Sequence, residues 1–145
     1  MCPDATLNFD NLRTTDNTSS DGYPVSALAF LGDGVWGIMV REYLTVQAKC
    51  KADKLHEKNI EMVNATYQAN AIKKLLPFLS EDESTMFIRG RNTHTAHTPR
   101  NKSKSDYHAA TGLEVLFGWL YINGKTDRLK QLFSVVTQEV LYGKE

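Results

Sequence analysis

The chain has 145 residues, of which 41% are hydrophobic and 23% are charged, and this balance is typical of one soluble globular domain. Its 17 basic and 17 acidic residues cancel, which argues against nucleic acid as a partner unless the basic residues cluster. No apolar run is long enough to span a bilayer, the N-terminus lacks the pattern of a secretory signal, and two cysteines are too few for a disulfide framework. We therefore expect a cytoplasmic protein, with the matrix of an organelle as the alternative.

Residues 1–22 are rich in Asp, Asn, Thr and Ser and show no hydrophobic periodicity. This composition predicts a flexible N-terminal arm, with one docked turn around Leu7 and Phe9. The remaining residues, 23–145, are expected to form a single folded domain.

Helical patterns account for that domain. Apolar residues recur at helical spacing in each segment, and no stretch alternates with the period of two that a half-buried strand requires. The predicted helices span residues 24–46, 52–79, 80–90, 105–122 and 126–141. Their expected boundaries are set by Pro77, the capping box of Ser80 and Glu83, Gly90, the Ser105-Asp106 cap and the Asn123-Gly124 break. The predicted fold class is all-α.

Two acidic residues, Asp33 and Glu114, each lie on an apolar face of a predicted helix. Their neighbours three and four positions away are alanine, glycine, threonine or aromatic residues. An ionised carboxylate on such a face is costly unless a cation meets it. We therefore expect the two acids to face each other across a cleft and to hold a hard divalent cation. The alternative for each acid is a buried ion pair, with Arg41 or Lys58 as candidate partners.

Basic residues cluster between positions 89 and 106, where five of them accompany one acid. Residues 91–104 are almost without apolar side chains and are expected to form a long loop. This local excess of positive charge favours contact with the phosphates of RNA, and a solvated surface loop is the alternative. The histidines in and after the loop are too loosely spaced, and too far from cysteine, to favour a zinc site. The basic residues are Arg89, Arg91, Arg100, Lys102 and Lys104.

The two acidic helices resemble those of the ribonuclease III family. The signature helix of that family is matched by Leu28-Ala29-Phe30-Leu31-Gly32-Asp33-Gly34-Val35, and its second acidic helix by Gly112-Leu113-Glu114-Val115-Leu116-Phe117-Gly118. Further matches point to the shorter Mini-III branch, which has the nuclease domain and no separate double-stranded-RNA-binding domain. These matches are Lys54-Leu55-His56-Glu57-Lys58, Val63-Asn64-Ala65, Gln68-Ala69, Arg89-Gly90-Arg91-Asn92 and Thr98-Pro99-Arg100-Asn101.

The resemblance implies a ribonuclease III endonuclease-domain-like helical bundle that works as a homodimer. It also implies cleavage of double-stranded RNA with Mg²⁺, for which Mn²⁺ can substitute, in the maturation of a large-subunit ribosomal RNA precursor. Asp33 and Glu114 match the catalytic, metal-binding acids. The residues expected to bind RNA are Arg89, Arg91, Asn92, Arg100, Lys102 and Lys104.

Two positions depart from the pattern of the longer family members. Ala29 and Thr111 stand where those proteins have acids, on the same helix faces as Asp33 and Glu114. Their loss is expected to remove ligands or supporting groups of the metal. It motivates one alternative, a catalytically inactive RNA-binding module on the same fold. A second alternative is an unrelated helical metal-dependent phosphohydrolase that acts on small nucleotides.

Overall fold

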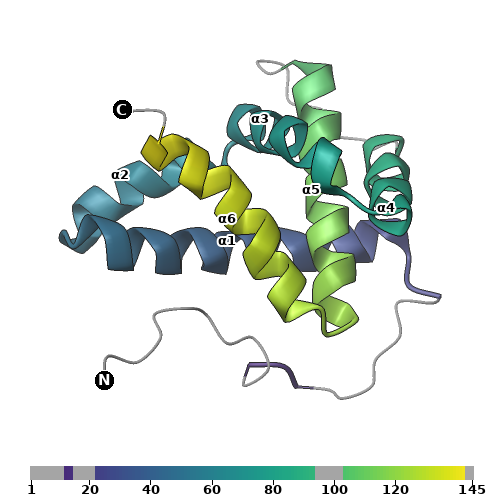
Figure 1. Cartoon of the computed structure of the whole chain (residues 1–145), viewed down its shortest axis with the longest axis horizontal. Coiled ribbons are helices and arrows are strands. Elements are labelled where there is room, and N and C mark those ends of the chain that lie inside the picture. The colour runs from purple at the N-terminus through teal and green to yellow at the C-terminus, as the bar shows by residue number, and fades with distance from the viewer. Residues whose placement is uncertain (1–11, 15–21, 94–102, 143–145) are drawn as a thin grey trace.

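The computed structural model of the chain describes residues 12–14, 22–93 and 103–142 (Figure 1). The described residues form helices and contain no strand, which confirms the all-α prediction. The elements are α1 (Val25–Ala48), α2 (Ala52–Val63), α3 (Ala65–Leu75), the short 3₁₀ helix η2 (Leu76–Phe78), α4 (Glu81–Arg91), α5 (Lys104–Ile122) and α6 (Thr126–Tyr142). None of these helices is both long and apolar enough to cross a membrane.

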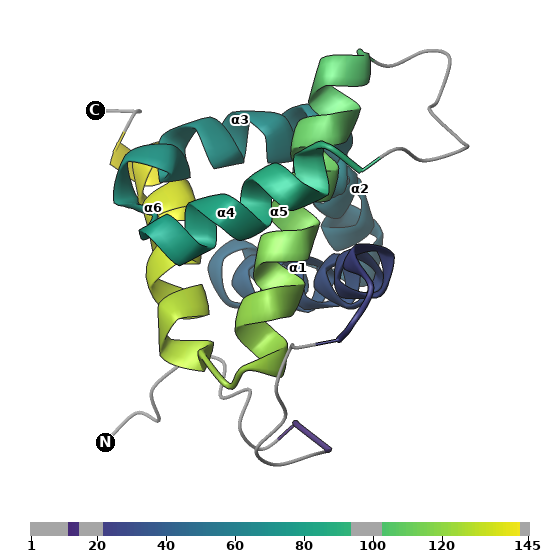
Figure 2. The same ribbon diagram turned by 90° about the vertical axis from the view of Figure 1, so that its right-hand side faces the viewer.

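Helix α5 runs through the bundle, and α1, α3, α4 and α6 pack around it (Figures 1 and 2). The centre of the core is aromatic. Trp36 of α1 is fully buried and meets Phe117 of α5 and Phe133 of α6 edge to face, with ring centroids 5.3 Å apart in each pair. Its indole nitrogen donates a hydrogen bond of 2.9 Å to the carbonyl oxygen of Met62. Trp36 therefore joins α1 to α2, α5 and α6 at one point.

Glycine allows α1 and α5 to cross in direct backbone contact. A Cβ atom on Gly32 would overlap the carbonyl oxygen of Glu114, and one on Gly118 would overlap the carbonyl oxygen of Leu28. Both positions therefore require a residue without a side chain. This crossing is the feature of the fold that places the two acidic residues beside each other.

The predicted helix over 52–79 is wrong as a single element, because the chain breaks at Asn64. Asn64 has extended backbone (ψ 160°) and its side-chain oxygen accepts a hydrogen bond of 2.8 Å from the backbone nitrogen of Tyr67. Its side-chain nitrogen donates to the carbonyl oxygen of Ile60, at 3.0 Å. One asparagine thus closes α2 and caps α3. Pro77 lies in η2, after α3 has ended at Leu75.

Two further boundaries differ from the predictions. Gly90 does not end α4, because the helix continues to Arg91 and Gly90 instead packs against Gly112 and Val115 of α5. Helix α5 is capped by Ser103, two residues before the predicted cap, with its hydroxyl accepting from the backbone nitrogen of Asp106. The capping box at Ser80 is confirmed by reciprocal hydrogen bonds with Glu83 of 2.9 and 3.2 Å.

Of residues 1–22, the structure describes residue 22 and the segment 12–14. There the Arg13 guanidinium donates a hydrogen bond of 3.1 Å to the carbonyl oxygen of Ile122 and covers Gly124. This contact supplies a donor to the C-terminal end of α5, where carbonyl groups lack helical partners. The docked turn expected around Leu7 and Phe9 lies outside the described residues.

Candidate active site

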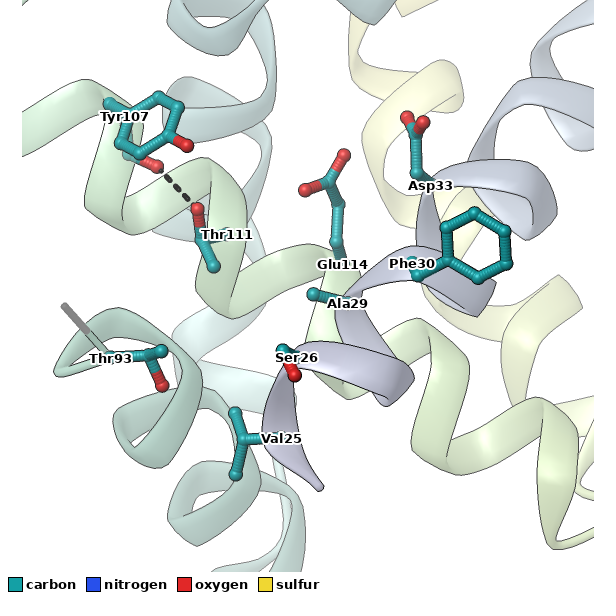
Figure 3. A pocket seen from close by; sticks show the side chains of 9 residues that line it. All are labelled: Val25, Ser26, Ala29, Phe30, Asp33, Thr93, Tyr107, Thr111 and Glu114. Atoms are coloured by element: carbon teal, nitrogen blue, oxygen red, sulfur yellow. Dashed lines mark hydrogen bonds between the residues drawn. The ribbon is translucent and has the colours of Figure 1, made fainter. Parts of the chain in front are cut away.

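The crossing of α1 and α5 brings Asp33 and Glu114 to one cleft of about 260 Å³ (Figure 3). Both side chains extend to the same side of the crossing, Asp33 from α1 and Glu114 from α5. Asp33 is exposed, whereas Glu114 is half-buried between the helices. The end of α4 and the first turns of α5 form the far wall, with Thr93 and Tyr107. The cleft is thus open to solvent and has its two carboxyl groups together at one end.

The environment of Glu114 favours its protonated form. Burial and the facing Asp33 carboxyl raise its pKa to about 8, and the amide of Gln68 acts weakly in the opposite direction. Two adjacent carboxyl groups, one of them half-buried, resist carrying two negative charges together. A bound cation would remove that resistance.

The buried ion-pair alternative does not describe this pair. Within the part of the chain that the structure describes, neither Arg41 nor Lys58 nor any other basic side chain forms an ion pair with Asp33 or Glu114, whereas Lys54 pairs with Glu57 and Arg128 with Glu83. Arg41 lines a separate cleft between α1 and α2. Two carboxylates that meet without a cationic side chain have the chemistry of a divalent-cation site, since Mg²⁺ is bound through one or two carboxylates and completes its shell with waters and phosphate oxygens.

The two positions that lack an acid lie in the same cleft. Ala29 is one turn before Asp33 and Thr111 is one turn before Glu114, and both line the cavity (Figure 3). The Thr111 hydroxyl donates a hydrogen bond of 3.0 Å to the carbonyl oxygen of Tyr107, within its own helix. Across the described residues, no cluster of three or more His, Cys, Asp or Glu side chains is placed to hold a metal. The site as built therefore has a pair of acids.

The described basic residues lie at the edge of this cleft. Arg89 and Arg91 are exposed in the last turn of α4, Asn92 is its C-terminal cap, and Lys104 is the first residue of α5. Because Thr93 lines the cavity, the end of α4 borders the same cleft as the acidic pair, at its far wall. The Arg91 guanidinium stacks over the ring of Phe87 at 5.6 Å. Arg100 and Lys102 lie outside the described residues, as do His94 and His97.

One polar residue near the acids had no role assigned from the sequence. Gln68 of α3 is 3% exposed, and its side-chain nitrogen is buried without a hydrogen-bond partner among the described residues. Its signal in the sequence is an amide on the apolar face of a helix, with Ala65, Ala71 and Ile72 at helical spacing. Gln68 belongs to one of the motifs matched to the ribonuclease III family, but a sequence motif does not show which side chains surround Gln68 in the fold.

Comparison with known proteins identifies the family. A sequence profile of the Ribonuclease III domain matches residues 26–125. Mini-ribonuclease 3 of Clostridium tetani is 37% identical over 110 residues, which cover 75% of this chain and 73% of that protein. Mini-ribonuclease 3 of Thermoanaerobacter sp. is 34% identical over 113 residues, covering 78% and 80%. A crystal structure of a Fusobacterium nucleatum protein superimposes with a TM-score of 0.73 at 30% identity, covering 81% of this chain and 94% of that one.

The chain therefore belongs to the ribonuclease III family and is an endoribonuclease. Within that family the similarity is to the Mini-ribonuclease 3 proteins, as the motifs predicted. The alternative of an unrelated helical phosphohydrolase is wrong.

Proposed function

We propose that the chain cleaves double-stranded RNA in a reaction that depends on a divalent cation, Mg²⁺ or in its place Mn²⁺, held by Asp33 and Glu114. The observation that carries this proposal is the pair of carboxyl groups, one from each of two crossing helices, that meet in an open cleft without a cationic partner among the described residues. When bound, the cation would activate a water and neutralise charge on the scissile phosphate.

The two acids would make different contributions. Asp33 is exposed at the mouth of the cleft, where a phosphate of the substrate can reach it. Glu114 is half-buried and must be ionised to act as a ligand, although its pKa in the metal-free protein is about 8. Cation binding is therefore coupled to release of a proton from this pair.

Basic residues beside the cleft would bind the RNA backbone. Arg89, Arg91 and Lys104 carry positive charges at the junction of α4 and α5, and Asn92 adds an amide there. Double-stranded RNA is recognised mainly by its shape and through phosphate and 2′-hydroxyl contacts, which suits a short exposed set of arginine and lysine side chains. Arg100 and Lys102, which the sequence also predicts to bind RNA, lie outside the described residues.

Self-association through α1 would complete the enzyme. Phe30 lies on α1 beside the cleft and is 85% exposed, and Ile38 further along is 41% exposed. Among the described residues, no atom outside the neighbouring turns of α1 lies within 4 Å of where a Cβ on Gly34 or Gly37 would be, so another backbone could approach closely there. An exposed aromatic residue on such a helix favours a homodimer in which the α1 helices of two copies meet. Two clefts would then face one duplex.

The substrate we propose is a large-subunit ribosomal RNA precursor, cleaved in the cytoplasm. The nuclease domain would comprise residues 23–145, with residues 1–22 as a flexible arm. The proposal of this substrate follows the similarity to the Mini-ribonuclease 3 proteins rather than any residue of the cleft.

A cleavage assay with matched variants tests the role of the acidic pair. Purified protein is incubated with a long RNA duplex in Mg²⁺ or in EDTA, and the products are separated on a denaturing gel. Asp33→Asn should reduce cleavage by about 100-fold or more while duplex binding is kept, since it removes a cation ligand and no basic residue. Asp53→Asn, at an exposed aspartate of α2, is the control and should cleave normally. Normal cleavage by Asp33→Asn would refute the assignment, and duplex binding without cleavage by the wild type would favour the inactive module.

A further inference from the structure

Gln68 is a polar residue in an apolar place. Its side chain is 3% exposed, and its amide nitrogen has no hydrogen-bond partner among the described residues. A buried amide donor without a partner destabilises the folded state, whereas leucine or methionine would fill a similar volume without that cost. A residue that only filled the core would therefore be apolar, so the amide calls for another explanation.

Fixed contacts hold the beginning of α3 beside the acidic pair. Asn64 caps the helix on the backbone nitrogen of Tyr67, and the ring of Tyr67 lies 6.4 Å from that of Trp36, three residues after Asp33. The Trp36 side chain also binds the carbonyl oxygen of Met62, just before the break. Helix α3 in turn packs on α5, which carries Glu114. Helix α3, which carries Gln68, is thus held by contacts with both helices of the acidic pair.

The amide faces a carboxyl group that needs a donor. The Gln68 side chain on α3 lies within reach of the half-buried Glu114 carboxyl on α5, although its amide nitrogen completes no hydrogen bond within the described residues. A hydrogen bond from an amide to an ionised carboxylate is stronger than one between neutral groups. Such a bond would also restrict the carboxylate to one orientation, which a long glutamate side chain does not otherwise keep.

We propose that Gln68 is a positioning residue of the endoribonuclease: its side-chain amide donates a hydrogen bond to the Glu114 carboxylate and aims that carboxylate at the cation shared with Asp33. This inference depends on the proposed function, because it assumes that the acidic pair binds a cation. In this arrangement α3 supports the site from behind, and Gln68 makes no contact with the RNA. Groups that orient metal ligands typically change metal affinity by about 10- to 100-fold when they are removed.

The test compares metal binding with stability in the absence of RNA. Gln68→Met and Gln68→Leu remove the donor and keep an apolar side chain of similar size. Mn²⁺ is titrated calorimetrically into each variant and into the wild type, and the melting temperature is measured separately in EDTA. We expect the Mn²⁺ affinity of both variants to fall by about 10-fold or more, with an EDTA melting temperature equal to or above that of the wild type. Gln47→Met, at an exposed glutamine of α1, is the control and should change neither quantity.

The outcomes separate this inference from the proposed function. Wild-type affinity for Mn²⁺ in both Gln68 variants would overturn the positioning role and leave the acidic pair in place. A fall of the EDTA melting temperature in both variants would also overturn it, since Gln68 would then be a structural residue. If the wild type binds no Mn²⁺, or if Asp33→Asn binds it equally well, the proposed function itself fails.

Discussion

Replacing Gly32 by alanine should push α1 away from α5 and so separate Asp33 from Glu114. The new Cβ would overlap the carbonyl oxygen of Glu114 and lie 2.9 Å from the backbone nitrogen of Gly118. Both atoms belong to the backbone of a packed helix and cannot rotate away, so the expected cost is at the upper end for overpacking, about 3 kcal/mol. Alanine regains about 1 kcal/mol of helix propensity, which leaves a net loss of about 2 kcal/mol.

For a chain of this length, a loss of about 2 kcal/mol corresponds to a fall of about 8 °C in melting temperature. Gly34→Ala is the matched control two positions away, measured at protein concentrations low enough to keep the chain monomeric. Within the monomer no described residue outside its own stretch of helix lies within 4 Å of its Cβ, so its propensity gain of about 1 kcal/mol is unopposed. Urea unfolding followed by tryptophan fluorescence measures both variants. Repeating it at several protein concentrations separates self-association from folding, since only the former depends on concentration. A neutral or stabilising Gly32→Ala would refute the account of the crossing.

Two predictions concern ionisation. The Arg128 guanidinium, with two hydrogen bonds of 2.8 Å to Glu83, holds the pKa of that buried carboxyl below its ordinary value of 4.5. Arg128→Ala should lower the free energy of unfolding in urea by about 2 kcal/mol at neutral pH. The difference from wild type should shrink as the pH falls through the lowered pKa of Glu83, because the protonated carboxyl no longer pairs with Arg128. An equal difference at acidic pH would contradict the stabilising role of the Arg128–Glu83 ion pair. Glu114 behaves in the opposite sense, because its folded pKa of about 8 lies above the ordinary 4.5. In the metal-free protein, the stability contributed by protonated Glu114 is fully present below its ordinary pKa of 4.5 and is lost as the pH rises through its folded-state pKa of about 8. The melting temperature in EDTA should therefore fall between about pH 5 and about pH 8. Glu114→Gln should remove most of this fall, and an unchanged fall would show that other groups cause it.

The acidic pair was predictable because its signal is local. At both Asp33 and Glu114, the sequence shows a carboxylate among apolar neighbours at helical spacing. Because an unpaired carboxylate in the core is costly, we expected the two acids to face each other across a cleft. The structure places both acids in one cleft, together at one end of it, and their role there stays a prediction. The capping box at Ser80 was predictable for the same reason, since both of its hydrogen bonds join residues three positions apart.

The break at Asn64 was not predictable from periodicity. Apolar residues continue at helical spacing on both sides of it, so the pattern predicts one long helix through 52–79. The direction of the chain changes there because Asn64 caps α3 while Met62 accepts the hydrogen bond of Trp36 from α1. That second contact joins residues 26 positions apart, and a local pattern carries no information about it.

Three properties of this protein can be predicted from local sequence patterns: it is helical, two of its acids lie on apolar helix faces, and its motifs are those of a ribonuclease III. These properties depend on residues within one or two helical turns of each other. The contact between Gly32 and Gly118, and the burial of Gln68 with its amide nitrogen unpartnered among the described residues, are visible only in the tertiary fold. Such contacts form between helices that are far apart in the chain and pack together in one close-packed core. The way the backbones cross in that core decides which side chains lie together in the site.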